Sequence, residues 1–354
     1  AGHGCGHNLF GVASLGAATA IKEMIETGEL EGTVRFYGTP AEEKFFGKLW
    51  MIRAGLFEDV DVVMDWHPSA ETKADVNSNL ALIDVTVEFR GQSAHAALDP
   101  WNGRSAGDGL EMFVVGINYL REHIKPSVRI HYQIQESGKV ANVVPDYARI
   151  WTRVRDNSKA GMLEVYERVK EIARGASIMA GVDYEISLIS GLHEIIVNRA
   201  GGAALQKNLE LLGPIKYTED ELEFARRLQR NTGKRPVGMN AAIQPLEPTV
   251  EQMIGASSDV GDVSWIVPEI RLAVTTAPVG TRWHSWPVVA CGGMSIGHKG
   301  LVYAAKALSL TIVDLFEDEE LRADIKSEFE ERRAGTSYEV MLPDGPPPIE
   351  EARP

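Results

Sequence analysis

The chain has 354 residues, of which 44% are hydrophobic and 24% are charged, and its formal net charge is −14. This composition is typical of a folded globular protein, the length predicts two domains, and the acidic charge argues against nucleic acid as a partner. No apolar run reaches the roughly 18 residues needed to cross a bilayer, the start has no signal peptide, and the two distant cysteines form no disulfide framework, so we expect a cytoplasmic protein without a membrane partner.

Helices and strands alternate in the first 81 residues. The Ala-rich stretch Leu9–Ile25 has apolar residues at helical spacing and predicts a helix, with Asn8 as its N-cap candidate. A strand is expected over 33–37, a helix over 48–54 and a strand over 60–65. This alternation predicts a parallel α/β layer, in which ligands bind beyond the carboxyl ends of the strands.

From about residue 82 the pattern changes to alternating polar and apolar residues. The expected order is strand 83–89, helix 105–123, strand 128–135, strand 147–155, helix 162–179 and strand 184–189. This β-α-β-β-α-β order is typical of a ferredoxin-like α+β unit. We therefore predict an α/β fold in which a smaller domain, 82–194, is inserted into a larger one formed by 1–81 and 195–354.

The last part of the chain is expected to return to the larger domain. Two helical segments follow residue 194, then a polar region over 231–251, a strand over 271–276 and a helix over 301–316. Residues 342–354 are rich in proline and acidic side chains and predict a disordered or surface-draped tail.

Cys5 and His7 stand between glycines near the start of the chain. Thiolate sulfur and imidazole nitrogen are ligands that zinc and related divalent metals prefer. The glycines permit the tight, positive-φ turn that such a site often needs. By itself the pair is a weak signal, because cysteine is among the residue types most often buried for packing alone.

Further ligand-type residues stand in predicted loops. Glu42 and Glu43 follow the strand expected at 33–37, and in a loop one carboxylate can ligate a cation while the other acts as general base. Taken one at a time, these residues have a simpler explanation: the two glutamates can belong to a solvated loop, and His67 and His284 can be structural histidines. The coincidence favours a metal site, whose candidate ligands are Cys5, His7, Glu43, His67 and His284.

Several motifs in order resemble the M20 metallopeptidase family, and within it the amidohydrolase branch whose ligand set includes a cysteine. The motifs are Gly4-Cys5-Gly6-His7-Asn8, Gly38-Thr39-Pro40-Ala41-Glu42-Glu43, Trp66-His67-Pro68, Gly91-Gln92-Ser93-Ala94-His95-Ala96-Ala97, Ala141-Asn142-Val143-Val144-Pro145, His284-Ser285-Trp286 and Ile296-Gly297-His298-Lys299-Gly300. They cover nearly the whole chain, and their combination is far more specific than any one of them.

The resemblance implies a catalytic domain with a mixed or parallel sheet flanked by helices, and an inserted domain that serves as dimerisation domain or lid. It implies two divalent metal ions, Zn²⁺ or Mn²⁺, with Cys5 joining them. Glu42 becomes the general base that activates the metal-bound water. The expected substrate is a small-molecule amide, an acyl or aminobenzoyl amino acid such as an acyl-glutamate.

The resemblance also assigns residues outside the metal site. It implies that His95 reaches across a homodimer interface and stabilises the reacting carbonyl oxygen in the partner's site. Asn142 and Arg155 are similar to residues that bind the terminal carboxylate of the substrate. Without the resemblance, His95 and Asn142 would be interpreted as turn residues. A dimer with a paralogous subunit is the alternative assembly.

Three departures from the family pattern bear on function. Asn8 stands where the branch often has Asp, and Lys44-Phe45-Phe46-Gly47 stands where close relatives are glycine-rich. The family has roughly a hundred residues, comparable with a small domain, before the Cys-His motif, so we expect the catalytic domain to lack its N-terminal part. A dipeptidase or aminoacylase and a non-catalytic metal-binding subunit are the alternative functions.

Overall fold

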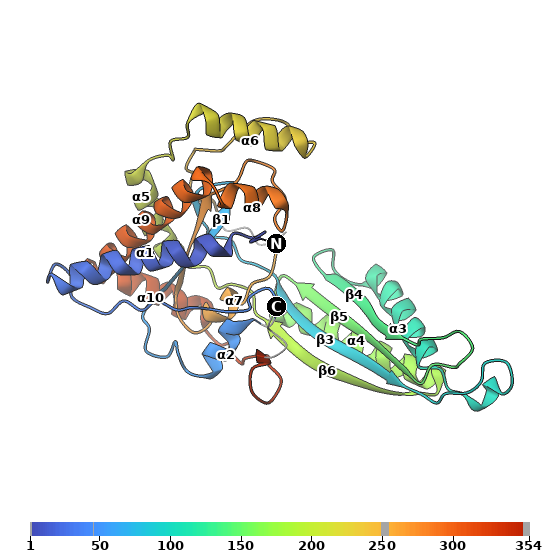
Figure 1. Cartoon of the computed structure of the whole chain (residues 1–354). Helices are drawn as coiled ribbons and strands as arrows, with labels where there is room; N and C mark the ends of the chain where they lie inside the picture. Colours follow the sequence, from blue (N-terminus) through green and yellow to red (C-terminus); the bar gives the residue numbers. More distant parts are fainter. Residues whose placement is uncertain (1, 45, 249–254, 350–354) are drawn as a thin grey trace.

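The computed structural model describes residues 2–44, 46–248 and 255–349. It is a mixed α/β protein with two sheets flanked by helices, as the sequence predicts, and the sheets lie side by side (Figure 1). Among the described residues, none of the helices is both long and apolar enough to cross a membrane.

The first sheet contains β1 (Val63–Ser69), β7 (Glu269–Thr275) and β2 (Lys73–Ala74) in the order β1-β7-β2. β1 runs parallel to β7 and β2 runs antiparallel to it, so this small sheet is mixed. Apolar side chains on both faces of parallel strands need cover from helices. The helices around this sheet are α1 (His7–Glu26), α5 (Arg199–Leu212), α9 (Ser295–Glu317) and α10 (Glu319–Arg333) (Figure 1).

The core of this part joins those helices to the sheet. Trp66 and Leu272 are each 1% exposed, and they pack in one cluster with Leu9 of α1, Leu205 of α5 and Leu308 of α9. Burying one large apolar side chain contributes about 1.5–3 kcal/mol. This core places the start of α1 beside the carboxyl end of β1.

The second sheet is fully antiparallel and has the order β4-β5-β3-β6. Its strands are β3 (Ala81–Arg90), β4 (Arg129–Ser137), β5 (Tyr147–Asp156) and β6 (Asp183–Leu192). Helices α3 (Ala106–Leu120) and α4 (Lys159–Ala180) cover one face (Figure 1). The predicted β-α-β-β-α-β order is present, whereas the domain limits at 82 and 194 stay a prediction.

Side chains alternate along β5 as a one-sided sheet requires. Ala148, Ile150 and Val154 are completely buried under the helices, while Arg153 and Arg155 lie on the open face. The open face is therefore polar, and Arg155 on this face lines a cleft that is also lined by Cys5 and Glu43.

The strand expected over 33–37 is wrong. These residues join no ladder within the described part of the chain, and Phe36 is 47% exposed. The segment is held instead by side chains: Arg35 pairs with Asp59, and the Tyr37 hydroxyl donates to the Leu56 carbonyl at 2.7 Å. A segment with the residue pattern of a strand forms one only where a neighbouring segment is available for backbone hydrogen bonds.

The strand expected over 60–65 begins three residues later and extends to Ser69, so His67 lies within β1 rather than after it. The register with β7 explains the shift, because the ladder runs on to the pair Ser69 and Thr275. Helix α2 (Gly47–Arg53) agrees with the prediction, and the two helical segments after residue 194 are α5 and α6 (Glu219–Asn231).

Several elements were not expected. These are α7 (Val260–Val263), α8 (Trp286–Gly292), α10 and the 3-10 turns at Pro100–Asn102 and Arg121–His123. In the polar region over 231–251, Asn231 is the last residue of α6, and the rest of the described part, 232–248, has no helix or strand. The tail drapes over the surface up to residue 349, with Leu342 buried, and residues 350–354 lie outside the described part.

Candidate metal centre

Glycines bring the Cys5–His7 turn against two other segments. Gly6 has φ +80°, and a Cβ at this position would meet the Pro68 ring of β1 at 2.9 Å. A Cβ at Gly4 would lie 3.1 Å from the Cα of His284, whose amide donates to the Gly4 carbonyl at 2.8 Å. Only residues without a side chain allow this close approach. The turn is therefore packed directly beside the segments that carry His67 and His284.

All five predicted ligands converge at this turn. The Cys5 Sγ lies 3.6 Å from His67 Nε2. Glu43 Oε1 lies 3.8 Å from His7 Nε2 and 3.4 Å from His284 Nε2. Ligand atoms within 4.8 Å of one another form three groups: Cys5, His7 and His67; Cys5, Glu43 and His284; and His7, Glu42 and Glu43.

The donor set fits divalent cations. It combines one thiol, three imidazoles and a carboxylate, which suits zinc and leaves manganese open. Cys5, His7 and Glu43 each belong to two of the groups, and such overlap is expected where two ions share ligands. His67 is oriented for this role, because its Nδ1 donates to the Pro68 carbonyl at 2.6 Å and leaves the Nε2 lone pair facing Cys5.

The electrostatics of the cluster favour a cation. Burial, together with the charges of Glu43 and Glu42, raises the pKa of Cys5 to about 12. Burial also lowers the pKa of His7 and of His67. A divalent cation bound here would lower the pKa of the Cys5 thiol again, because its positive charge stabilises the thiolate.

Backbone strain is concentrated at the same place. Among the described residues, the non-glycine residues with positive φ are Ala41, Phe46 and His284, with φ of 59°, 54° and 60°. Ala41 and Phe46 bracket the Glu42–Glu43 loop, and His284 is a candidate ligand. Such conformations cost about 1–3 kcal/mol each and gather at functional sites, where the surrounding structure imposes them.

Glu42 lies at the rim of the ligand cluster. Its pKa is raised to about 6, chiefly by burial and then by the charge of Asp259, while a hydrogen bond with the Ser258 side chain opposes the rise. Sequence reasoning did not single out Ser258 or Asp259. Their neighbours are small and polar residues such as Ser257 and Asp262, so no signal in the sequence indicates that Asp259 is completely buried and needs a specific partner.

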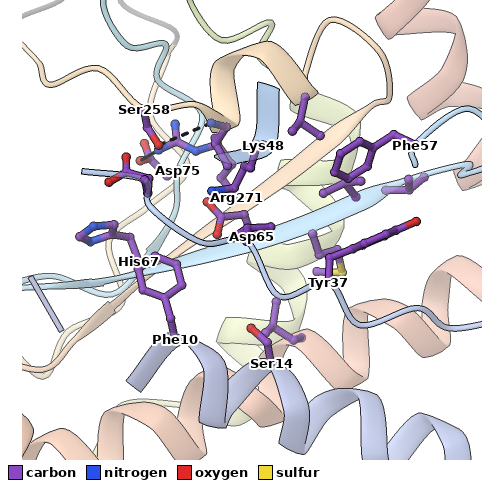
Figure 2. A pocket seen from close by; sticks show the side chains of 18 of the residues that line it. Phe10, Ser14, Tyr37, Lys48, Phe57, Asp65, His67, Asp75, Ser258 and Arg271 are labelled. Carbon is purple, nitrogen blue, oxygen red and sulfur yellow. Dashed lines mark hydrogen bonds and ion pairs between the residues drawn. The ribbon is translucent and has the colours of Figure 1, made fainter. Parts of the chain in front are cut away.

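The cluster opens into a cleft of about 1520 Å³. The cleft is lined by all five candidate ligands and Glu42, and Arg155 reaches it from β5. Lys48, Asp65 and Arg271 lie close together on one wall, with His67 and Phe10 nearby (Figure 2). The volume is large enough for a substrate of several hundred cubic ångströms.

His95 and Asn142 do not line this cleft. Both are exposed in loops of the second sheet, where the backbones of His95 and Val143 form a bridge and the Ala96 amide donates to the Asn142 carbonyl at 3.0 Å. Within one chain, the structure brings together the five ligands and Glu42, Arg155 lines the same cleft, and the His95–Asn142 pair lies apart.

Peptidase family M20/M25/M40 matches residues 1–258. The chain belongs to peptidase family M20. It is 35% identical to one of the subunits of p-aminobenzoyl-glutamate hydrolase from Escherichia coli (strain K12), over 97% of this chain and 76% of that protein. It is 28% identical to the Xaa-Arg dipeptidase of Mus musculus, over 93% of this chain and 70% of that protein.

Solved structures agree with the M20 fold. The aminobenzoyl-glutamate utilization protein from Klebsiella pneumoniae superposes with a TM-score of 0.57 at 18% identity, over 86% of this chain and 67% of that one. A dinuclear metal-binding M20 peptidase from Bacillus subtilis superposes with a TM-score of 0.53 at 18% identity, over 89% of this chain and 74% of that one. Membership of the family makes this M20 protein a hydrolase and implies divalent metal ions.

Proposed function

We propose that this M20 protein is a metal-dependent amidohydrolase that cleaves N-acyl or aminobenzoyl amino acids, with acyl-glutamates as the expected class. The observation that carries this is the convergence of Cys5 and four further ligand-type side chains beside the Glu42 carboxylate. When bound, two zinc or manganese ions supply Lewis-acid polarisation of the carbonyl and a water of lowered pKa.

Glu42 is the proposed general base. Its carboxylate lies in one group with His7 and Glu43, so it borders the place where water and the scissile carbonyl must meet. In this role Glu42 takes a proton from the attacking water and returns it to the nitrogen of the departing amine. General acid–base catalysis of this kind contributes about 10²- to 10⁴-fold to the rate.

His95 is proposed to act in the cleft of a second copy of the chain. Its Nδ1 accepts hydrogen bonds from the amides of Ala97 and Leu98, at 3.1 and 3.2 Å. In the neutral ring the proton must then be on Nε2, which becomes a donor suited to a developing oxyanion. The exposed position of His95 supports a homodimer formed through residues 82–194. Two different subunits of the same Escherichia coli hydrolase are among the relatives, which makes a paralogous partner the alternative.

Arg155 and Asn142 are the proposed contacts for the substrate's terminal carboxylate. Arg155 lines the cleft, and its buried Nε has no hydrogen-bond partner within the described structure. A guanidinium with free donors binds carboxylates in a fixed, two-pronged geometry. Asn142 lies in the loop beside His95, so it reaches a substrate together with His95. The free thiols of Cys5 and Cys291 support a cytoplasmic location.

A substrate panel tests the proposed reaction. The protein is loaded with zinc or manganese, and hydrolysis of p-aminobenzoyl-glutamate, N-acyl amino acids and dipeptides is measured together with metal content. We expect cleavage of acyl-glutamates, and Glu42→Ala should keep its metal but lose nearly all turnover. Preference for dipeptides would favour the dipeptidase, which the 28% identical Xaa-Arg dipeptidase supports. Full metal content without turnover on the panel would favour a non-catalytic binding protein.

Mixing two inactive variants tests the role of His95. His95→Ala retains Glu42, and Glu42→Ala retains His95, so a mixed dimer contains one complete site. Random reassociation of equal amounts should restore about a quarter of the wild-type activity, because half of the dimers are mixed and each has one working site of two. Absence of any recovery in verified mixed dimers would contradict the proposed reach across the interface.

A further inference from the structure

Lys48 and Asp259 form an ion pair in the wall of the cleft. Lys48 Nζ lies 2.7 Å from Asp259 Oδ1, and the Lys48 backbone amide donates to Asp259 Oδ2 at 3.1 Å. The side chain of Asp259 is completely buried and that of Lys48 is 13% exposed. Asp259 therefore holds both the side chain and the backbone of the same residue. This two-point contact fixes the start of α2 against the segment that precedes α7.

The start of α2 is rigidly joined to the loop that carries Glu42. The Phe46 amide donates to the Ala41 carbonyl at 2.9 Å and closes the loop. A Cβ at Gly47 would lie 2.1 Å from the Pro40 carbonyl oxygen, so the two ends of the loop are in direct contact. A displacement of Lys48 therefore also displaces the loop, because the two segments are packed in direct contact.

The same segment also lines the cleft beside the base. Ser258 directly precedes Asp259, and Ser258 and Glu42 both line the cleft. Figure 2 shows Ser258 and Lys48 on the same wall of the cleft. The segment that holds the loop through Lys48 and Asp259 is thus part of the same cleft as the Glu42 carboxylate.

The holding segment is itself anchored. Asp262 of α7 accepts a hydrogen bond from His193 Nδ1 at 2.8 Å, from the His193 amide at 3.1 Å and from the Tyr338 hydroxyl at 3.0 Å. Asp262 and His193 are 0% and 1% exposed. These bonds connect α7 to the end of β6 and to the C-terminal segment, so Asp259 has a fixed position from which to hold α2.

We propose that Lys48 and Asp259 are positioning residues that hold the Glu42 carboxylate at the ligand cluster. This inference rests on the proposed function, in which Glu42 is the base. Stability alone explains the pair poorly, because a buried ion pair is often no more stabilising than apolar residues of similar volume. The position of the pair, between the loop that carries Glu42 and the anchored segment before α7, accounts for it.

The test compares Lys48→Met, Lys48→Arg and Asp259→Asn with a matched control, Lys299→Met. Lys299 makes a comparable ion pair with the buried Glu221, at 2.6 Å, and does not line the cleft. Hydrogen exchange is measured in peptides covering residues 41–53 without metal, and kcat, KM and metal content are measured on p-aminobenzoyl-glutamate with zinc. The Asp259 variant covers the case in which Lys48→Met fails to fold.

We expect Lys48→Met and Asp259→Asn to exchange about tenfold faster over 41–53 and to lose about 10- to 100-fold in kcat, with KM within about threefold. Lys48→Arg should recover most of the rate, and Lys299→Met should change neither readout. Unchanged exchange, or unchanged kcat in a folded variant with faster exchange, overturns the positioning role. If the wild type hydrolyses no panel member, the proposed function fails, and exchange alone decides whether the pair holds the loop.

Discussion

Substitution of Gly47 by alanine should disturb catalysis through the loop that carries Glu42. The added Cβ would lie 2.1 Å from the Pro40 carbonyl oxygen, whereas ordinary contacts begin at 3.4 Å, so one partner must move by at least 1.3 Å (3.4 − 2.1). Both groups belong to backbone or to Cβ, and no side-chain rotation relieves the overlap. Overpacking of this kind costs about 1–3 kcal/mol, and a misplacement of about 1 Å at a reacting group costs about 100-fold in rate.

The assay measures kcat on an acyl-glutamate, metal content and the midpoint of thermal unfolding. Gly175→Ala is the matched control, because Gly175 lies inside α4 and an added Cβ there has no neighbour within 4 Å. This control should be stabilised by about 0.5–1 kcal/mol and keep full activity. If Gly47→Ala retained kcat within about threefold at an unchanged midpoint, the close contact of the loop with α2 would not govern the base.

Three further predictions concern stability. Burial alone raises the pKa of Glu221, but hydrogen bonds with Lys299 and other partners lower it to about 2. The contribution of Glu221 to the free energy of unfolding is therefore present above pH 4.5 and is lost as the pH falls toward 2. In Glu221→Gln, the free energy of unfolding, measured by urea titration, should depend less on pH in that interval. Tyr338→Phe removes one of the donors to buried Asp262 and should cost about 1–3 kcal/mol, with an unchanged urea midpoint as the contrary result. Added zinc should raise the melting midpoint of the wild type far more than that of Cys5→Ser, and chelation should abolish the rise; equal shifts would remove Cys5 from the ligands.

Periodic patterns in the sequence identified most of the regular elements. The β-α-β-β-α-β order between residues 81 and 192 followed from alternation in its strands and helical spacing in α3 and α4. Helix α10 was missed although Leu321, Ile325 and Phe329 recur every four residues, because its many charges masked the stripe. The short α7 has only four residues, too few for any periodic signal.

Local sequence patterns could not predict which distant segments pair with one another. Residues 33–37 have the composition of a strand but pair with no neighbouring backbone within the described chain, so they form no strand. The register of β1 against β7 moved His67 into the strand. Register depends on both partners at once, and one segment's pattern contains only half of that information.

The sequence by itself determined which chemistry was available: a thiol, imidazoles and adjacent carboxylates in motifs that match the M20 family. Only the tertiary structure decided that the candidate ligand atoms of Cys5, His7, Glu43, His67 and His284 lie within a few ångströms of one another, and that His95 does not join them in the same chain. It also revealed the Lys48–Asp259 pair, whose partners are 211 positions apart. Ligand type is a property of a residue, whereas distance and burial arise from the packing of segments remote in sequence.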